Sequence, residues 1–517
     1  MERARLIDVL GIIAALAVYA LGLYRHRVFF HDDAYISLRY ARNLAEHGEL
    51  AWNLGERAEG YTSLLHVLVS AAMIRLGVDP VAAVQVIGIV SAVAICLMTS
   101  VAARRLVPDA EMAVARALIL VTVMATPTMA IWSLGGLEAL MAAALLLAGL
   151  LALLGAERPN YGQAAVWFSL AILTRLDASV FITGAGAGLF LASKVTGWRR
   201  LLGPAVVVGF PAAVSFLQMA VRYVYYGELF PLTFYAKVGV DPAVRVNFLT
   251  EFYLPRIPTV VPIVCIAVAV ICLALLTMTR GRIWILAIPV LLHAAYIVWS
   301  GGDHMSGMRS FAVLIAPAGL VILCFVSRWG LRFANAVTLV LVPPCVVLAL
   351  LMKPLKMDQA ALVGRIAGEY INEAWPARST VALHTAGSTA FYATSNFYVD
   401  MLGLNTSAIA HRDPVPILAP WQMIAGHSKG DGAYVLSQEP DYIILGGSFG
   451  THPDEPFFLN DVELAAMDEF WQCYSEVRVL MDVTDEDMKL SDHDVIEKDM
   501  IYFERLCPKT ERAAVAR

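Results

Sequence analysis

The sequence predicts a polytopic α-helical membrane protein with a C-terminal α/β domain, and three observations lead to this fold class. Of its 517 residues, 59% are hydrophobic and only 16% are charged, whereas a soluble chain is nearer half apolar and a quarter charged. The apolar residues gather in long runs almost free of charge, each near the length that spans a hydrocarbon core. These runs end near residue 352, beyond which acidic residues and turn formers become common.

Nine apolar runs are unambiguous. They occupy residues 7–24, 82–103, 114–132, 136–154, 203–224, 259–279, 283–299, 311–327 and 333–352. The first run lacks a small-residue cleavage site behind it, so we expect a retained helix and not a removed signal peptide. Residues 161–193 form either one very long helix or two short ones broken at Arg175–Asp177. Residues 61–78 contain His66 and Arg75, and they form either a span or a juxtamembrane or re-entrant helix.

The distribution of basic residues favours one topology, because cytoplasmic loops are enriched in Lys and Arg. With a cytoplasmic N-terminus, a non-spanning 61–78 and two spans in 161–193, the chain has about eleven transmembrane helices. The residues that then fall in cytoplasmic loops are Arg104, Arg105, Arg158, Lys194, Arg199, Arg200, Arg280, Arg282, Arg328 and Arg332. A spanning 61–78 would instead place two of these basic clusters outside.

The same topology divides the chain into two predicted domains. Residues 1–352 form a transmembrane domain with a large first external loop at 25–81, and residues 353–517 form a soluble external domain. In the latter we expect a helix at 357–374. Strands are expected at 379–384, 397–402, 441–446, 475–482 and 500–506. Cys473 and Cys507 lie in this domain, and they can pair if it faces an oxidising compartment.

Unusual polar residues gather on the predicted outer side. They are Asp32, Asp33, Glu59, Glu138, Arg175, Asp177, Lys237, Asp303 and Arg309. A charge near bilayer depth costs roughly 2.5–3.5 kcal/mol on insertion scales, so a one-sided concentration suggests a functional site. The alternative is that external loops are simply polar, but the cytoplasmic loops are short, basic and nearly free of carboxylates.

Several short motifs occur in a fixed order along the predicted outer side. They read DDAYISLRYARNL, WNLGERAEGYTS, LGGLEAL, TRLDA, YYGELFPLTFYAKVG and GGDHMSGMR, and the later segments VDMLGLN and GHSKGDGAYVLSQEPDYIILGG follow them. Two carboxylates in the first external loop resemble those of the GT-C glycosyltransferases, which are polytopic enzymes that use lipid-phosphate sugars. From about residue 30 to 450, the longer pattern resembles the branch of the mycobacterial terminal arabinofuranosyltransferase.

The resemblance implies an inverting glycosyltransferase that takes a sugar, arabinofuranose in that branch, from a polyprenyl-phosphate donor. The acceptor is then a cell-envelope glycan or glycoconjugate. The donor's phosphate leaves without protonation, so the reaction requires a carboxylate base for the acceptor hydroxyl and cations where negative charge develops. A general acid is not needed, and direct displacement inverts the anomeric centre.

Asp32 and Asp33 are the candidates for the base. Adjacent helical residues point about 100° apart, so only one is expected to meet the acceptor. We prefer Asp32 as the base and Asp33 as a helix cap or supporting group. The alternative is that an aspartate here only caps the helix that follows.

Lys237, Arg309 and Arg175 are the candidates for binding the donor phosphate. Lys and Arg at helix ends also snorkel to lipid headgroups, and Arg175 can simply pair with Asp177. The remaining candidates for substrate binding or for shaping the site are Glu59, Tyr61, Thr62, Glu138, Asp177, Asp303 and His304. Glu138 and Asp303 can alternatively be acids favoured by a helix N-terminus.

No obligatory metal is predicted, although Asp303, His304 and the two aspartates of the first loop could together bind a divalent ion. The only expected cofactor-like molecule is the lipid-linked sugar donor. The net charge of −5 suggests no nucleic-acid role, and we expect a monomer in the inner (plasma) membrane with its active site on the external or periplasmic side. The alternatives are a lipid-linked oligosaccharide ligase or polymerase and a multi-pass transporter, although no internal repeat is visible.

The topology makes a direct prediction about two loop positions. A cysteine introduced at Asp109 should react with a membrane-impermeant maleimide only after the membrane is opened, whereas one at Val240 should react in intact cells. Labelling of position 109 from outside would overturn the proposed orientation.

Overall fold

The computed structural model describes residues 2–155, 159–237, 246–277, 281–302, 305–424, 426–492, 496 and 498–510. Two compact units make up the chain, and neither is continuous in sequence. The helical unit comprises Met1–Arg27, Val84–Gln218 and Val246–Leu355. The mixed unit comprises Val28–Ala83, Met219–Arg245 and Lys356–Arg517. The first loop therefore belongs to the same compact unit as the C-terminal residues.

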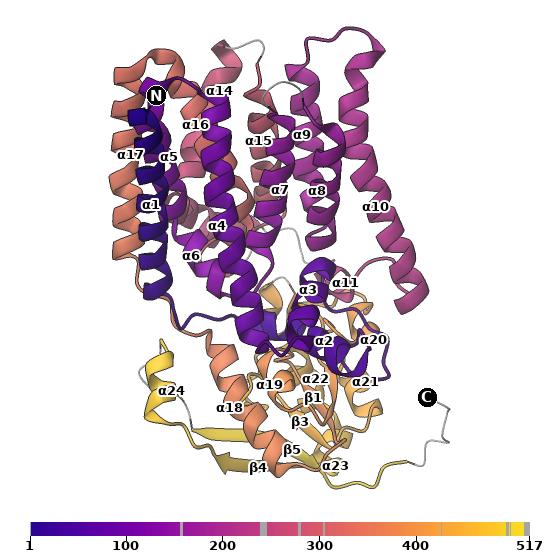
Figure 1. Cartoon of the computed structure of the whole chain (residues 1–517). Helices are drawn as coiled ribbons and strands as arrows, with labels where there is room; N and C mark the ends of the chain where they lie inside the picture. The colour runs from indigo at the N-terminus through magenta and orange to yellow at the C-terminus, as the bar shows by residue number, and fades with distance from the viewer. Residues whose placement is uncertain are drawn as a thin grey trace. The chain divides into compact units, whose positions relative to one another are not determined.

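The helical unit is built from long apolar helices, drawn as the upper bundle in Figure 1. Its main helices are α1 (Glu2–Arg25), α4 (Pro80–Leu106), α5 (Ala113–Ala125), α6 (Pro127–Leu134), α7 (Ala139–Leu153), α8 (Tyr161–Thr174), α9 (Ala178–Ala192), α10 (Leu202–Tyr226), α14 (Pro262–Thr277), α15 (Trp284–Trp299), α16 (Ala312–Val326) and α17 (Leu331–Leu351). Short helical turns connect them: η1 (Ala110–Met112), η2 (Trp198–Leu201), η3 (Phe248–Tyr253), η4 (Leu254–Arg256), α13 (Ile257–Val260), η5 (Arg309–Phe311) and η6 (Ser327–Trp329).

This protein is a polytopic helical membrane protein. In the described part of the chain, five helices are long and apolar enough to cross a membrane: Glu2–Arg25, Pro80–Leu106, Trp198–Tyr226, Arg309–Trp329 and Leu331–Leu351. Two bent pairs bring this number to as many as seven: Ala110–Ala125 with Pro127–Leu134, bent by 46°, and Phe248–Val260 with Pro262–Leu273, bent by 91°. The other predicted runs form apolar helices of 14–16 residues, α7, α8, α9 and α15, so the number of eleven crossings stays a prediction.

The two ambiguous segments have distinct outcomes. Residues 161–193 form two helices, α8 and α9, and the break lies at Arg175–Asp177 as the two-helix interpretation expects. Residues 61–78 contain only α3 (Leu64–Arg75), which has 12 residues and belongs to the mixed unit. A helix of this length falls short of the roughly 20 residues that cross a bilayer.

Helix packing in the helical unit depends on small residues. Helix α16 is buried on all sides and packs against α5, α7, α14 and α15, as a uniformly apolar helix should. Gly184 and Gly188 place one face of α9 directly against α15. A Cβ added at Gly188 would lie 2.1 Å from the Trp284 carbonyl oxygen, and one at Gly184 would lie 2.5 Å from Pro289 Cα. Such close approach lets helices associate without a hydrophobic driving force.

The mixed unit contains a five-stranded sheet with the strand order β2-β1-β3-β5-β4. Its strands are β1 (Thr380–Leu383), β2 (Phe397–Asp400), β3 (Tyr442–Ile444), β4 (Tyr474–Leu480) and β5 (Asp499–Arg505). Strands β2, β1 and β3 are parallel, with Val381 opposite both Tyr398 and Tyr442, whereas β5 is antiparallel to β3 and β4. All five predicted strands and the helix at 357–374 are confirmed.

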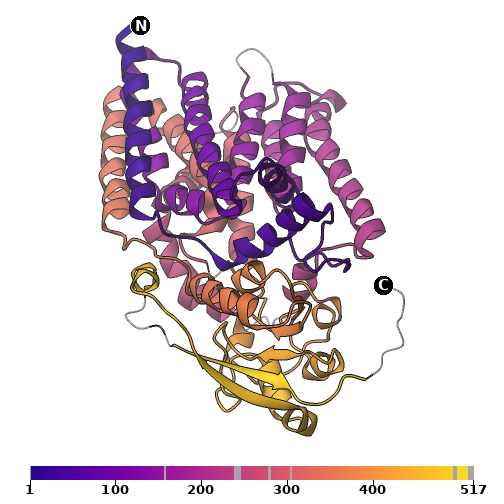
Figure 2. The same ribbon diagram turned by 60° about the horizontal axis from the view of Figure 1, so that its bottom comes forward.

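Side chains alternate between two cores on the faces of this sheet. On one face, helix α18 (Gln359–Ala374) packs against Val381 and Leu383, and residues of the first loop such as Trp52 join the same core. Figure 2 shows this helix lying across the strands. On the other face, Ala382 and Ile443 pack with apolar residues from the segments between β1 and β3 and after β3.

Short helices complete the mixed unit. They are α2 (Asp32–His47), α3, α11 (Leu232–Lys237), α19 (Ser388–Tyr392), α20 (Ser407–Ala410), η7 (Pro420–Met423), α21 (Gly432–Ser437), α22 (Leu459–Ala465), α23 (Asp468–Cys473) and α24 (Asp485–Leu490). A disulfide joins Cys473, at the end of α23, to Cys507 beyond β5, with a Cα–Cα distance of 4.9 Å. It ties the last strand of the chain to the helix that precedes β4.

Candidate functional site

The two aspartates of the first loop begin helix α2, and their neighbour His31 caps it. The Nδ1 atom of His31 accepts a hydrogen bond from the Asp33 backbone N–H at 3.2 Å, which satisfies one of the donors left over at a helix start. His31 also lies 3.3 Å, through Nε2, from an oxygen of Asp358. The cap of α2 is therefore the His31 side chain and not an aspartate.

The Asp32 carboxylate is fixed by the start of α19. One of its oxygens accepts hydrogen bonds from the Ser388 backbone N–H at 2.8 Å and from the Ser388 hydroxyl at 2.7 Å. Asp32 is only 8% exposed. Gly387 permits this approach, since a Cβ there would lie 2.2 Å from the other Asp32 carboxylate oxygen. The side chain is thus held in one position by residues 356 positions later in the chain.

Burial raises the pKa of Asp32 to about 6, and the hydrogen bonds from Ser388 oppose this shift. The nearby charges of Asp358 and Asp33 raise the pKa further. Asp33 itself is partly exposed. The two neighbouring carboxylates therefore have different surroundings, one nearly enclosed and hydrogen-bonded to Ser388 and the other with access to solvent.

The EGYTS motif is held against the C-terminal end of α10, which from Met219 onward belongs to the mixed unit. Glu59 forms a buried ion pair with Arg222, and its carbonyl accepts a hydrogen bond from the Leu232 N–H at 2.8 Å. The hydroxyls of Tyr61 and Tyr226 are 3.2 Å apart. Thr62, by contrast, is exposed. Glu59 and Tyr61 therefore hold the loop in place, and Thr62 alone of these three candidates presents its side chain at the surface of the unit.

Lys237 ends helix α11 and lies against the GHSKG segment. A Cβ added at Gly426 would lie 3.3 Å from Lys237 Cε, and Gly426 has a positive φ of 90°. The ring of Tyr235, two residues before the lysine, contacts that of His411 with a centroid separation of 4.3 Å. Two motifs that are almost two hundred residues apart in sequence thus meet within the mixed unit.

Glu138, Arg175 and Asp177 form one ion-pair network in the helical unit. Arg175 donates to Glu138 Oε1 at 2.7 Å and to both oxygens of Asp177 at 2.9 and 2.7 Å. Burial alone would raise the pKa of Asp177, but the charge and hydrogen bonds of Arg175 lower it to about 2. Arg175 therefore pairs with Asp177, as the alternative interpretation of the sequence expected, and also with Glu138.

Arg309 extends this charged cluster. Its guanidinium lies over the Trp132 ring, 5.6 Å from the centroid. The preceding turn is held by Trp132 and Thr128, which donate to the Ser306 and Gly307 carbonyls at 3.0 and 2.7 Å. The charges of His293 and Arg309 both contribute to the low pKa of Asp177. The helical unit thus gathers four of the predicted site residues, Glu138, Arg175, Asp177 and Arg309, and one more ionisable side chain, His293, lies near Asp177.

Asp303 and His304, two further candidates, lie outside the described residues. Among the described residues, the structure contains no group of three or more His, Cys, Asp or Glu side chains arranged to hold a metal ion. The carboxylates of Glu59 and Asp177 pair with arginines, and that of Asp32 accepts from a serine.

Sequence reasoning missed several partners of the predicted residues. They are Ser388 and Asp358 beside Asp32, Arg222 beside Glu59, and His293 near Asp177. Arg222 and His293 carry a signal, because each is a lone ionisable residue in an otherwise apolar run. Ser388 carries none, since nothing in its local sequence points to a partner so far away in the chain.

Comparisons with known proteins agree with this architecture. Residues 355–493 match a protein family described as a domain of unknown function, DUF8728. No curated protein matches the sequence.

Two solved structures share its fold. ArnT from Cupriavidus metallidurans, bound to undecaprenyl phosphate, is 14% identical with a TM-score of 0.50, over 75% of this chain and 85% of that one. The archaeal oligosaccharyltransferase AglB from Archaeoglobus fulgidus, in complex with an inhibitory peptide and a dolichol-phosphate, is 12% identical with a TM-score of 0.51, over 76% of this chain. The chain spans 64% of the length of AglB. It has the GT-C-like fold.

The buried carboxylate of Asp32 predicts a pH-dependent stability. Between about pH 4 and 6 the folded protein keeps a proton on Asp32 that the unfolded chain has released, so its stability falls as pH rises through this window. Asp32→Asn cannot ionise but still offers Ser388 an acceptor oxygen. Thermal unfolding in detergent should therefore show this variant gaining stability relative to the unsubstituted protein between pH 4 and 7.

Asp413→Asn, at an exposed aspartate of the same unit, is the matched control and should show no such gain. A constant difference between the protein and Asp32→Asn across this pH range would contradict the buried ionisation.

Proposed function

We propose that this protein is an inverting glycosyltransferase that moves a sugar from a polyprenyl-phosphate donor to a cell-envelope glycan or glycoconjugate on the outer face of the membrane. The carboxylate pair at the start of α2 carries the proposal. Such a transfer needs one base to take the proton of the acceptor hydroxyl as that oxygen attacks the anomeric carbon and the lipid phosphate departs. The departing phosphate needs no proton, so one accessible carboxylate suffices.

The contacts of the two aspartates favour Asp33 as the base and Asp32 as the group that positions it. Asp32 is nearly enclosed, and one of its oxygens already accepts two hydrogen bonds from Ser388. The other oxygen lies against Gly387, so an acceptor hydroxyl has little access to this carboxylate. Asp33 is partly exposed and follows Asp32 directly on the helix. The sequence alone favoured Asp32 as the base, and this assignment reverses that preference. Substitution of each aspartate tests it.

Arg309 and Lys237 are proposed as ligands of the donor phosphate, and each is tested on its own. The Arg309 guanidinium is oriented by the Trp132 face, and a guanidinium can bind two phosphate oxygens at once. In this proposal Arg175 stays paired with Glu138 and Asp177 and contributes positive charge near Arg309. That both structures of similar fold hold a polyprenyl phosphate, undecaprenyl phosphate in ArnT and dolichol-phosphate in AglB, supports a lipid phosphate as the sugar carrier.

Two observations support an extracytoplasmic site. Basic residues gather in the loops predicted to be cytoplasmic, and the candidate residues lie in the others. The Cys473–Cys507 disulfide lies in the mixed unit, which also contains Asp32 and Asp33. Disulfides persist in oxidising compartments and are rare in the cytosol, which supports an outer location for the mixed unit.

We propose arabinofuranose as the donor sugar, and the motif resemblance supports this choice. Incubation of the purified protein with a panel of polyprenyl-phosphate sugars tests this proposal, with released polyprenyl phosphate and glycosylated acceptor as the readouts. Release of polyprenyl phosphate with one sugar only would identify the donor. Transfer only from pyrophosphate-linked oligosaccharides would instead favour a ligase, and flux across proteoliposomes without transfer would favour a transporter.

Substitution of each aspartate separates the two roles. Asp33→Asn should lower turnover by about a hundredfold or more, because general-base catalysis contributes roughly 10²–10⁴ in rate, while donor affinity stays nearly unchanged. Asp32→Asn keeps an acceptor for Ser388 and should retain a substantial part of the turnover. The opposite pattern would assign the base to Asp32.

The phosphate ligands are tested by donor affinity. A charge-assisted contact contributes roughly 1.5–3 kcal/mol, so Arg309→Ala and Lys237→Ala should each weaken donor binding about ten- to a hundredfold with any acceptor. Arg309→Lys should recover only part of the loss, since it gives up bidentate geometry. Arg199→Ala, at an exposed arginine of η2, is the control. Unchanged donor affinity in both alanine variants would refute this phosphate site.

A further inference from the structure

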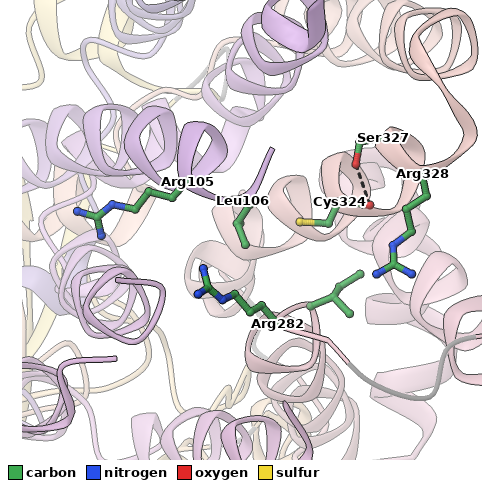
Figure 3. Close-up of a pocket in the computed structure, with 7 residues that line it drawn as sticks. Arg105, Leu106, Arg282, Cys324, Ser327 and Arg328 are labelled. Carbon is green, nitrogen blue, oxygen red and sulfur yellow. Dashed lines mark hydrogen bonds between the residues drawn. The ribbon is translucent and has the colours of Figure 1, made fainter. Parts of the chain in front are cut away.

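A pocket lined by arginines lies at one end of the helical unit, apart from the residues discussed above. Its volume is about 190 Å³, and it is lined by Arg105, Leu106, Arg282, Ile283, Cys324, Ser327 and Arg328. Figure 3 shows Arg282 and Arg328 extending from different segments around the space into which Leu106 and Cys324 also project. Neither the glycosyl transfer proposed above nor the motifs behind it involve these residues.

Three separate parts of the bundle contribute to the pocket. Arg105 and Leu106 end helix α4, Arg282 and Ile283 directly precede α15, and Ser327 and Arg328 follow α16. These three points lie at the end of the bundle at which α1 begins (Figure 1). The arginines are therefore brought together by tertiary packing and do not follow one another along a single helix.

The lining of the pocket is positively charged. It contains three arginines and no carboxylate. The Arg105 guanidinium donates to the Leu151 carbonyl at 3.0 Å, and the Ser327 hydroxyl donates to the Cys324 carbonyl at 3.0 Å. In the part of the chain that the structure describes, no carboxylate forms an ion pair with Arg282 or Arg328. An anion between these guanidiniums would relieve the repulsion among like charges.

Helix α15 adds to this positive potential. It has 16 residues and begins at Trp284, two positions after Arg282. The N-terminal end of a helix carries a partial positive charge, so a cation there is unfavourably placed unless an anion lies nearby. Arg328, in contrast, follows the C-terminal end of α16, where a cation is favoured. The helix dipoles thus favour a cation at the position of Arg328 and disfavour one at the position of Arg282.

Features around the pocket place it at the level of lipid headgroups. Helix α4, and α16 together with its flanking turns η5 and η6, are long and apolar enough to cross a membrane. Trp329, directly after Arg328, is 61% exposed and contacts Phe325 and Phe333 with ring centroids 6.2 and 6.1 Å apart. Exposed aromatic side chains next to apolar spans are typical of the membrane interface. A ligand of this pocket is therefore accessible from the bilayer.

We propose that this pocket binds the phosphate of an anionic phospholipid headgroup. The arginines supply charge-assisted hydrogen bonds to the phosphate oxygens, while Leu106 and Ile283 offer apolar contact to the carbon atoms beside it. The volume corresponds to roughly six water molecules at about 30 Å³ each. That suits a small headgroup and is below the roughly 300–1,000 Å³ of pockets that enclose larger ligands.

Lipid binding to the full-length protein tests the site. We would titrate phosphatidylglycerol into the protein in phosphatidylcholine nanodiscs and measure bound lipid by native mass spectrometry. The variant Arg282→Gln/Arg328→Gln should bind phosphatidylglycerol at least about tenfold more weakly, because each lost charge-assisted contact costs roughly one order of magnitude. Arg282→Lys/Arg328→Lys should recover part of the affinity, since the charge remains but the guanidinium geometry is lost.

The matched control removes the same number of charges elsewhere. Arg104→Gln/Arg199→Gln changes two exposed arginines that do not line the pocket, and it should alter affinity less than about twofold. Equal losses in both double variants would overturn the proposal, because general attraction of basic residues to anionic lipid would then explain the binding.

Displacement of the lipid by millimolar inorganic phosphate would overturn the lipid assignment in favour of a free anion. All variants should keep the thermal stability of the unsubstituted protein, since the substituted side chains are exposed.

Discussion

The contact between Asp32 and Ser388 is the constraint on which the mixed unit depends. A carboxylate at the first turn of α2 holds both donor groups of a serine at the start of α19, and a glycine before that serine leaves room for it. Around this contact, aromatic and aliphatic side chains of the first loop fill one core of the sheet together with α18. A loop that starts within the N-terminal part of a membrane protein thereby becomes part of a C-terminal α/β fold.

Residue patterns along the chain were enough to predict the apolar helices and the five strands, but not most of the short helices of the mixed unit. Every apolar run became a helix or a bent pair of helices. In lipid the backbone N–H and C=O groups must form hydrogen bonds within their own segment, whichever helices pack against it. The short strands were also predictable from local composition. What the local pattern could not show is which elements pack together. Residues 34–47, for example, have apolar and polar side chains on opposite faces of a helix, which suits a membrane surface as well as a protein core. In the structure α2 packs against α3 and α19.

The residues of the candidate site were also predictable from the sequence, whereas their pairing was not. Charged residues in an apolar chain draw attention because they are costly, and Glu138, Arg175 and Asp177 were found for that reason. Their arrangement was not predictable, because Arg175 is two residues from one partner and 37 from the other. The same limit applies to Glu59, whose buried ion pair with Arg222 joins segments 163 residues apart. Long-range pairing depends on tertiary structure, which no short window of sequence contains.

The discontinuous mixed unit has a consequence for biosynthesis. Asp32 meets Ser388 across 356 residues of chain, and synthesis proceeds at roughly 5–20 residues per second. After Asp32 is made, the ribosome therefore works for roughly 20–70 s before its partner exists. Throughout that interval Tyr40, Trp52 and their apolar neighbours have no core to enter. The nascent loop therefore remains without its packing partners while most of the bundle is inserted into the membrane. During this period a chaperone on the same side of the membrane would be needed.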